Sequence, residues 1–247
     1  MISDIRKQSI INDIRKKMII LSSSLPKSAS TIFATYIEDI VAESGRRNGQ
    51  GTLKKLVGGR YVDKISPGLA VRLLPAAYLQ GDMVLKSHCA PNRTVRWMIC
   101  ARQLKALYIF RDPRDVVLSA MDHRKRLGIS SDSAFGKFTD LASGCDGVIG
   151  WAKVWREWKD FGRAGFFRYE DLMTDPFVVL QKVCRYLDIE INDYAIKDII
   201  ARHDKNKHHS HNFNKGTVCR YKRECSAESR DLLEKSLGGL AREMGYD

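Results

Sequence analysis

The sequence predicts a single α/β domain with a central parallel sheet flanked by helices. Two observations support this fold class: four short segments are apolar on both faces, and longer segments between them repeat apolar residues at helical spacing. Such strands pair in parallel through right-handed crossovers, and ligands gather at their carboxyl ends. The chain of 247 residues shows no repeat and no dividing linker, so residues 1–247 are predicted to form one domain.

The predicted strands are brief, as strands buried on both faces are. They cover residues 18–23, 83–86, 106–110 and 165–168. The first predicted helix lies in residues 31–44, where one apolar stripe comprises Ile32, Phe33, Tyr36, Ile37, Ile40 and Val41.

Capping signals mark further helix starts. Ser66 before Pro67 supplies an N-cap and a first-turn proline. Other helices are predicted to begin near Asn92, Pro113, Asp146 and Asp175. A last helix follows Ser226, with an apolar stripe of Leu233, Leu237, Leu240 and Met244.

Two segments lack helical or strand periodicity. Residues 45–65 mix glycines with basic residues, and residues 203–225 are polar, basic and rich in histidine. Both are predicted to be mobile loops. Residues 1–17 are predicted to be an N-terminal extension.

The chain is basic, with 42 Lys and Arg against 29 Asp and Glu and a net charge of +13. The whole excess lies in residues 1–17, 46–64 and 201–225. Localised charge indicates anion sites. Duplex-binding proteins also concentrate charge on one face, so a nucleic-acid-binding function remains an alternative here.

Other patterns exclude several classes of protein. The six cysteines contain no C-x-x-C pair, which argues against a zinc ribbon or a redox dithiol, and most are predicted to be buried apolar residues in a reducing compartment. Residues 16–30 imitate a signal peptide, but serines, Pro26 and Lys27 interrupt the apolar run. No stretch approaches the roughly 20 residues of a membrane span. We therefore expect a soluble, cytoplasmic protein without a membrane partner.

The first predicted strand runs directly into Leu25-Pro-Lys-Ser-Ala-Ser-Thr31 and then into a helix. This arrangement brings backbone N–H groups, hydroxyls and Lys27 to one place, which suits an anion. It is not a Walker A loop, because the required glycines are absent. Ordinary helix capping is the alternative.

A second block, Tyr108-Ile-Phe-Arg-Asp-Pro-Arg-Asp-Val-Val-Leu-Ser119, begins in the third strand. Arg111 follows the carboxyl end of that strand and Ser119 lies two turns along the next helix. An arginine at such an edge suits bidentate contact with phosphate. An ion pair with Asp112 or Asp115 would explain Arg111 equally well.

Together these blocks resemble the cytosolic-type sulfotransferases. Residues 26–31 resemble their PKSGTT loop, and residues 108–119 resemble their R-[ND]-P-x-D-x-x-x-S block. Three more matches follow in the family's order: Val84-Leu-Lys-Ser-His88, Arg168-Tyr-Glu-Asp-Leu172 with Asp175-Pro176, and Phe213-Asn-Lys-Gly216. Five ordered blocks covering most of the chain make the resemblance specific.

The resemblance implies a strand–loop–helix fold similar to the P-loop NTPases, binding 3′-phosphoadenosine 5′-phosphosulfate (PAPS) and leaving adenosine 3′,5′-bisphosphate (PAP). By position, the 5′-phosphosulfate would be held by Lys27, Ser28, Ala29, Ser30 and Thr31. The 3′-phosphate would be held by Arg111, Ser119, Asn214, Lys215 and Gly216, while Tyr169 would meet the adenine. The catalytic residues would be Lys27, Lys86 and, as general base, His88.

Sulfuryl transfer by itself calls for these residue types. Like phosphoryl transfer, it needs positioning and charge stabilisation more than covalent chemistry. A lysine stabilises the departing phosphate, and an imidazole can take the proton of the acceptor. The scheme requires no metal, and the histidines His203, His208, His209 and His211 lack a known ligand spacing.

Departures from the family pattern affect donor binding. Ala29 replaces a loop glycine, so its backbone is expected to adopt a conformation that tolerates Cβ. Ile32 stands where many members have a tryptophan that stacks on adenine. Asn214 replaces an arginine, and Cys219-Arg-Tyr221 replaces the usual G-D-W.

The predicted reaction is sulfuryl transfer to a hydroxyl or amine of a small-molecule acceptor, with a specialised metabolite weakly favoured. A nucleotide or small-molecule kinase is the second enzyme hypothesis, and a basic nucleic-acid-binding protein is the non-enzyme hypothesis. Substrate walls are expected in residues 45–65, 127–147 and 203–225. The sequence does not identify the acceptor or the oligomeric state.

Overall fold

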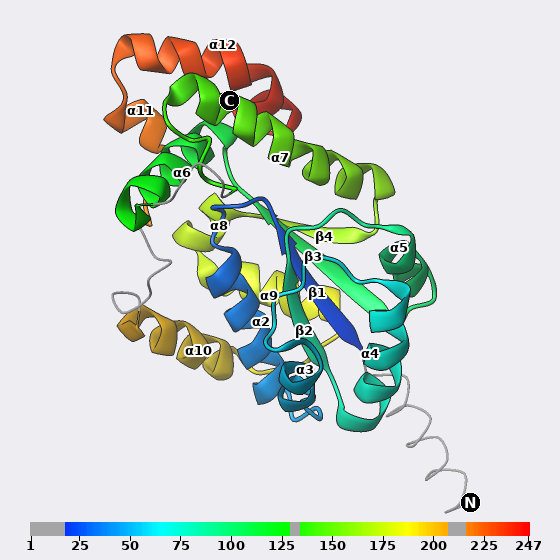
Figure 1. Cartoon of the computed structure of the whole chain (residues 1–247). Helices are drawn as coiled ribbons and strands as arrows, with labels where there is room; N and C mark the ends of the chain where they lie inside the picture. Colours follow the sequence, from blue (N-terminus) through cyan, green and yellow to red (C-terminus); the bar gives the residue numbers. More distant parts are fainter. Residues whose placement is uncertain (1–17, 129–133, 207–215) are drawn as a thin grey trace, which may run out of the picture.

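The computed structural model describes residues 18–128, 134–206 and 216–247. Its centre is a four-stranded, fully parallel sheet in the order β2-β1-β3-β4 (Figure 1). The strands are β1 (Ile19–Ser24), β2 (Met83–Ser87), β3 (Leu104–Phe110) and β4 (Ala164–Arg168). The predicted fold class is confirmed, and all four predicted strands are present with shifts of no more than two residues at either end.

Helices cover both faces of the sheet (Figure 1). One face packs on α2 (Ser30–Glu43) and α9 (Pro176–Leu187), beside which lies α10 (Asp193–Asn206). The other face packs on α4 (Pro67–Gln80), α5 (Arg93–Cys100) and α7 (Leu141–Phe161). The remaining helices are α3 (Gln50–Val57), α6 (Pro113–Leu127), α8 (Tyr169–Thr174), α11 (Arg220–Glu224) and α12 (Ala227–Glu243).

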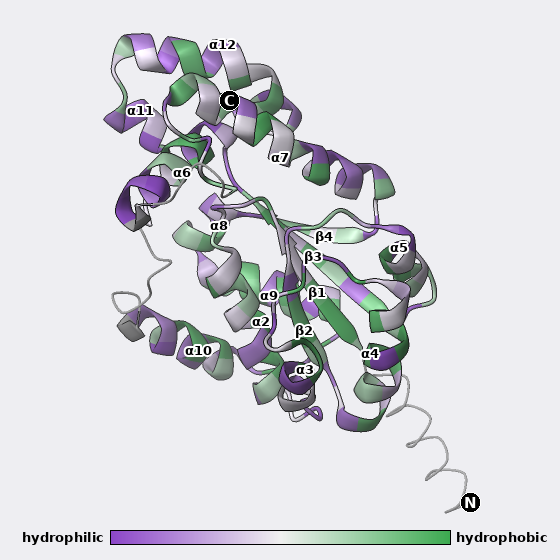
Figure 2. Cartoon of the chain, viewed as in Figure 1, coloured by the Kyte–Doolittle hydropathy of each residue, from purple (hydrophilic) through white to green (hydrophobic). Residues whose placement is uncertain are grey.

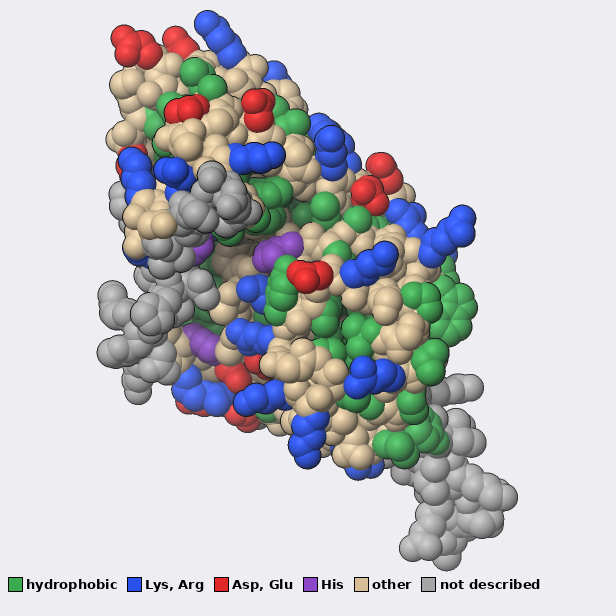
Figure 3. Space-filling view, viewed as in Figure 1, with side chains coloured by type: hydrophobic (Ala, Val, Ile, Leu, Met, Phe, Trp, Pro, Cys, Tyr) green, Lys and Arg blue, Asp and Glu red, His purple; other side chains and the backbone are tan. Residues whose placement is uncertain are grey.

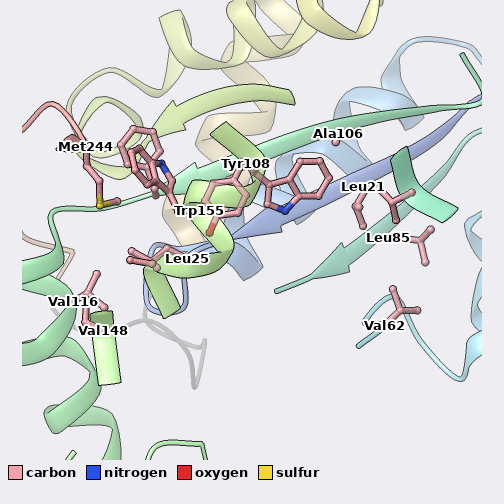
Figure 4. Packing of buried hydrophobic residues seen from close by; sticks show 14 of the residues in the cluster. Leu21, Leu25, Val62, Leu85, Ala106, Tyr108, Val116, Val148, Trp155 and Met244 are labelled. Atoms are coloured by element: carbon pink, nitrogen blue, oxygen red, sulfur yellow. The ribbon is translucent and has the colours of Figure 1, made fainter. Parts of the chain in front are cut away.

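The sheet separates two hydrophobic cores, because successive strand residues point to opposite faces. Ile20 packs with α2 and α9, whereas Ile19 and Leu21 belong to the core under α4, α5 and α7. Green ribbon in Figure 2 concentrates on the strands and on the helix faces turned toward them. Figure 4 shows the second core, in which Tyr108 and Trp155 lie between the sheet and α7. Trp158 on α7 is fully buried there.

The predicted caps are present. Ser66 Oγ accepts from the Leu69 amide at 3.2 Å, and Asn92 Oδ1 accepts from the Val95 amide at 3.0 Å. The start predicted near Asp146 is wrong: α7 begins at Leu141, where Asp140 and Ser143 form a reciprocal capping box. Gly144 and Gly147 interrupt the apolar pattern in the first two turns. Both allow close packing, because a Cβ at Gly144 would clash with Val117 and one at Gly147 with Phe138.

The prediction of loops at 45–65 and 203–225 needs correction. The first segment contains α3, whose Leu53 is fully buried, and Val62 pairs with β2 through a 2.9 Å hydrogen bond from its amide to the Lys86 carbonyl. The second contains the end of α10 and all of α11, while residues 207–215 lie outside the described part. Glycines and charges hid these elements, because the single buried side chain of α3 and the short α11 leave little periodicity.

Two further expectations concern the burial of the cysteines and the presence of membrane-spanning helices. Cys145 and Cys184 are buried, but Cys100 and Cys219 are exposed and the other two are half-buried, so the expectation of mostly buried cysteines is wrong. Within the described ranges, no helix has both the length and the apolar composition needed to span a bilayer.

The C-cap of α4 offers a test of the packing of residues 45–65. Gly81 has φ +108°, and a Cβ there would lie 2.0 Å from the Arg47 carbonyl oxygen. Gly45 also has positive φ, +69°, but a Cβ there would meet nothing within 4 Å. We expect Gly81→Ala to lower the free energy of unfolding by about 3 kcal/mol or more, and Gly45→Ala by only about 1–2 kcal/mol. Urea unfolding of both variants measures the difference, and equal losses would contradict the packing described here.

Candidate active site

The predicted site residues gather at the carboxyl edge of the sheet. Lys27 follows β1, Lys86 and His88 lie at the end of β2, Arg111 follows β3, and Tyr169 follows β4. Because the strands are parallel, all four ends meet at the same edge. The space-filling view shows a hollow on this face with Lys, Arg and His side chains along its walls (Figure 3).

The loop between β1 and α2 has an unusual backbone. Lys27 has φ 66°, and Ala29, the N-cap of α2, has φ 60° and ψ 28°. Both are left-handed conformations that L-residues adopt at a cost. The expectation that Ala29 would allow a Cβ-tolerant backbone is therefore wrong: the chain keeps the conformation that suits glycine, and Ala29 bears the strain.

A buried hydroxyl in this loop has no hydrogen-bond partner among the residues that the structure describes. The Ser28 side chain is fully buried, yet its Oγ makes no hydrogen bond to the described residues. An unpaired buried hydroxyl costs about 1–3 kcal/mol, so such groups are normally satisfied. Ser28 Oγ and the nearby first amides of α2 could together bind an anion. Helix capping does not explain this hydroxyl, because it makes no hydrogen bond to a described amide.

Lys86 ties the end of β2 to the same loop. Its Nζ donates to Thr31 Oγ1 at 2.9 Å. Burial lowers the pKa of the Lys86 ammonium, and the nearby charge of Arg60 lowers it further. Lys86 therefore sits at the loop as a partly desolvated cation, the state in which it stabilises anionic oxygen most strongly.

Arg60 is a further residue at this edge, and the sequence analysis above does not include it. Its guanidinium donates to Glu38 Oε2 at 2.7 Å and Thr35 Oγ1 at 2.9 Å, and to the Thr31 carbonyl at 3.5 Å. These contacts hold residues 58–65 against the start of α2. No sequence signal indicates them, because Arg60 lies in a glycine-rich segment distant along the chain.

His88 has a defined tautomer. Its Nδ1 lies 2.9 Å from Ser24 Oγ and 3.1 Å from the Ser24 carbonyl oxygen. A carbonyl only accepts, so these contacts assign the proton to Nδ1 and leave the lone pair on Nε2. Burial lowers the pKa of His88, the Ser24 carbonyl opposes that shift, and Lys86 adds to it. A neutral imidazole with a free Nε2 is what a general base requires.

Lys27 is a desolvated cation among other cations. Burial lowers its pKa to about 8, and the charges of Arg126, Arg111 and Lys86 contribute while Asp122 opposes them. Its Nζ lies 5.8 Å from the centroid of the Phe135 ring. Because Asp122 offsets only part of this positive charge, the position suits an anionic ligand.

Arg111 and Tyr169 lie together at a second position along this edge of the sheet. Arg111 Nη2 donates to Asp115 Oδ2 at 3.0 Å and to the Thr217 carbonyl at 2.8 Å. Its guanidinium stacks on Tyr169 at 4.1 Å. The ion pair is thus with Asp115, since Asp112 pairs with Arg114. Arg111 Nε is buried and unpaired within the described residues, so this guanidinium keeps one donor for a ligand.

The remaining predicted donor-binding residues differ in what the structure describes. Ser119 is buried on α6, two turns beyond Arg111. Gly216 has φ 64° and precedes Thr217, whose carbonyl binds Arg111. Asn214 and Lys215 lie outside the described residues.

His123 is a second functional candidate that the sequence-based analysis missed. It lies on α6, and burial lowers its pKa to about 4, helped by the charges of Lys27 and Arg126. Arg126 Nη2 lies 3.3 Å from His123 Nδ1, and a guanidinium only donates, so Nδ1 accepts and Nε2 carries the proton. Its ring contacts Phe135 at 4.7 Å. His123 thus presents a donor, whereas His88 presents an acceptor.

The histidine-rich segment gives no support for a metal. His203 Nε2 lies 2.7 Å from Asp39 Oδ2. Among the residues with described positions, no group of three or more His, Cys, Asp or Glu side chains could hold an ion. His208, His209 and His211 are outside those residues.

A family model described as "Sulfotransferase domain" matches residues 18–239. The chain belongs to the sulfotransferase family. The family predicted from the five sequence blocks is therefore confirmed, and the match favours a sulfotransferase over the kinase alternative. A search of curated protein sequences finds no significant match.

Solved structures agree on the fold of this sulfotransferase. Mouse sulfotransferase SULT7A1 complexed with PAP is 18% identical, with a TM-score of 0.55, and the match covers 93% of this chain and 88% of that one. Retinol dehydratase with androsterone and PAP is 15% identical, with a TM-score of 0.61 and coverage of 91% and 80%. The same enzyme with retinol and PAP gives a TM-score of 0.60 at 15% identity, over 91% and 81%.

The left-handed backbone at Ala29 generates a testable prediction. We expect Ala29→Gly to leave stability unchanged or raise it by up to about 1 kcal/mol, because relief of strain outweighs the greater entropy of unfolded glycine. Ala29→Val should lower stability by roughly 1–2 kcal/mol, because a β-branched residue fits this conformation poorly. Thermal unfolding of the three proteins tests this order, and a glycine variant less stable than the parent would contradict it.

Proposed function

We propose that this sulfotransferase takes a sulfuryl group from PAPS and passes it to a hydroxyl or amine of a small acceptor, with His88 as general base. One observation carries the proposal: a desolvated loop lysine, a second lysine and an imidazole with a free Nε2 lie at one edge of the sheet. This set matches the needs of in-line transfer: charge stabilisation and removal of one proton.

The residues fit the donor because they leave two separate anion positions unsatisfied. Lys27 to Thr31, with the buried Ser28 hydroxyl, would hold the 5′-phosphosulfate, and Arg111 with Ser119 would hold the 3′-phosphate. Asn214, Lys215 and Gly216 would complete that second position, and Tyr169 would contact the adenine of the donor. The similar structures of mouse sulfotransferase SULT7A1 and of retinol dehydratase are complexed with PAP, which supports the same ligand here.

The cofactor supplies the activated sulfuryl group, and the chain's residues prepare its transfer. Lys27 and Lys86 would stabilise the negative charge that the leaving group, PAP, gains as its bond to the sulfuryl group breaks. His88 Nε2 takes the proton of the acceptor as the acceptor's oxygen or nitrogen attacks. The Ser24 carbonyl holds the Nδ1 proton and so stabilises the imidazolium that results.

A small acceptor fits the surroundings of the base. The Tyr61 ring lies 5.9 Å from the His88 ring, and Lys86 Nζ lies 6.0 Å from the Tyr61 centroid. With Phe135 beside Lys27, these rings supply apolar walls close to the two lysines. Retinol dehydratase holds androsterone or retinol, both small, in the similar structures.

Titration with PAP tests the donor assignment. We expect the melting temperature to rise with PAP, because a ligand that binds only the folded state adds about 2.7 kcal/mol at a hundredfold excess over Kd. Arg111→Lys should reduce this shift at equal PAP concentration, since an ammonium lacks the planar fork of a guanidinium. Arg185→Lys on α9, away from the site, serves as the matched control. No shift for the parent chain would contradict the proposal.

The pH dependence of turnover tests the roles of His88 and Lys27. Activity requires neutral His88, so kcat/KM should fall with acid only below the ordinary histidine pKa of 6.5, because burial lowers the pKa of His88. Activity requires protonated Lys27, so kcat/KM should fall again above pH about 8.

Two variants separate the limbs of this profile. Lys27→Arg should retain part of the activity and lose the alkaline limb, since arginine stays protonated. His88→Ala should lower kcat about hundredfold or more and lose the acid limb while PAP still binds. An unchanged kcat for His88→Ala would remove His88 from the mechanism.

A further inference from the structure

The surface of α4 carries an apolar stripe that faces solvent. Val71 is 71% exposed, Leu79 is 57% exposed and Tyr78 is 49% exposed. Pro75, also exposed, lies between them, so the stripe repeats at helical spacing along the whole helix. Large exposed apolar surfaces mark binding faces in soluble proteins.

Helix α5 extends this apolar surface. Trp97 at its centre is 58% exposed. The two helices start side by side, because Asn92 Nδ2 at the start of α5 donates to the Ile65 carbonyl just before α4 at 3.0 Å. Figure 3 shows hydrophobic side chains along the edge of the molecule that α4 and α5 occupy in Figure 1. We name the surface formed by Val71, Pro75, Tyr78, Leu79 and Trp97 the α4–α5 face.

The charged side chains around this face are basic. Lys64, Arg72, Arg93 and Arg102 are exposed on α4, on α5 and at their ends. Between residues 44 and 111 the chain has thirteen Lys and Arg and only two carboxylates, Asp63 and Asp82, of which Asp82 is buried. Glu157 and Asp160 on α7 are exposed near the neighbouring Phe161, on which Arg96 stacks, and they limit the basic surface on that side.

We propose that the α4–α5 face binds the surface of an anionic lipid bilayer. An aromatic residue pair, aliphatic side chains and flanking arginines are the combination that anchors proteins at the interface between headgroups and acyl chains. The contact is peripheral, in keeping with the finding that no described helix could span a membrane. A second copy of the chain is a poorer occupant, because pairing this face with itself would oppose arginine to arginine.

The start of the described chain supports the same partner. The Met18 amide donates to Asp82 Oδ1 at 2.8 Å. Asp82 follows the last residue of α4, Gln80, by two positions, so Met18 lies near the end of α4. The preceding seventeen residues carry five basic and two acidic side chains. Each Lys or Arg near an anionic membrane contributes about 1 kcal/mol of attraction, so the net charge of this segment has the sign that an anionic membrane attracts.

Flotation of the full chain with lipid vesicles tests the proposal. We expect binding to vesicles of phosphatidylcholine and phosphatidylserine, weakened by salt, and little binding to phosphatidylcholine alone. The triple variant Val71→Ser, Leu79→Ser, Trp97→Ser should bind at least about tenfold more weakly, because it removes the buried apolar area. The triple variant Lys64→Gln, Arg72→Gln, Arg93→Gln should also weaken binding to the anionic vesicles by about tenfold or more.

Matched controls alter other exposed residues, on α9, α10 and α12. The apolar control is Val178→Ser, Tyr194→Ser, Leu232→Ser, and the charge control is Lys182→Gln, Arg185→Gln, Lys235→Gln. Both controls should bind as the parent does. Absence of vesicle binding, or binding that the α4–α5 variants leave intact, would overturn the proposal. So would an oligomer, seen by sedimentation, that the apolar triple variant dissociates without any vesicle binding. All variants should keep the PAP-dependent melting shift, so this result is independent of the proposed function.

Discussion

The parallel pairing of β1 with both β2 and β3 is the constraint on which the site depends. The register sets Ser22 beside Lys86, and Ser24 beside Ile109, so three strands end together. From there Ser24 reaches His88, and Thr31, in the first turn of α2, reaches Lys86. A shift by one residue would turn every strand side chain to the other face and separate these groups. The geometry of the candidate site is thus a consequence of sheet register.

The same edge concentrates desolvated charge, which is costly until a ligand arrives. Burial lowers the pKa of both Lys27 and Lys86, and Ser28 Oγ and Arg111 Nε lack partners within the described residues. Each of these features raises the free energy of the folded chain. An anion with two phosphate positions would satisfy all of them. The buried Asp115 supports this arrangement, because it binds Arg111 through one oxygen and the Tyr221 amide through the other.

The net charge of +13 does not come mainly from the candidate site. Lys86, Arg111 and Lys27 serve the site, but most of the basic excess of residues 44–111 is exposed on and around α3, α4 and α5. One edge of the molecule is therefore both apolar and basic. Arg60 and Tyr61 join this edge to the site, since their segment pairs with β2 and contacts both α2 and His88. The basic residues of this part of the chain are therefore divided between the candidate site and the edge formed by α3, α4 and α5.

The sequence by itself determined the strands, most helix starts and the family, because these depend on local patterns: apolar runs, caps such as Ser66 and Asn92, and short blocks around Lys27 and Arg111. Tertiary structure alone decided the rest. The tautomer of His88 and the contacts of Arg60 depend on partners from other segments. The left-handed backbone of Ala29 follows from no local sequence pattern either. Helix α3 stayed hidden for the same reason: its one buried side chain is defined by packing against the sheet and α4, which no local periodicity records.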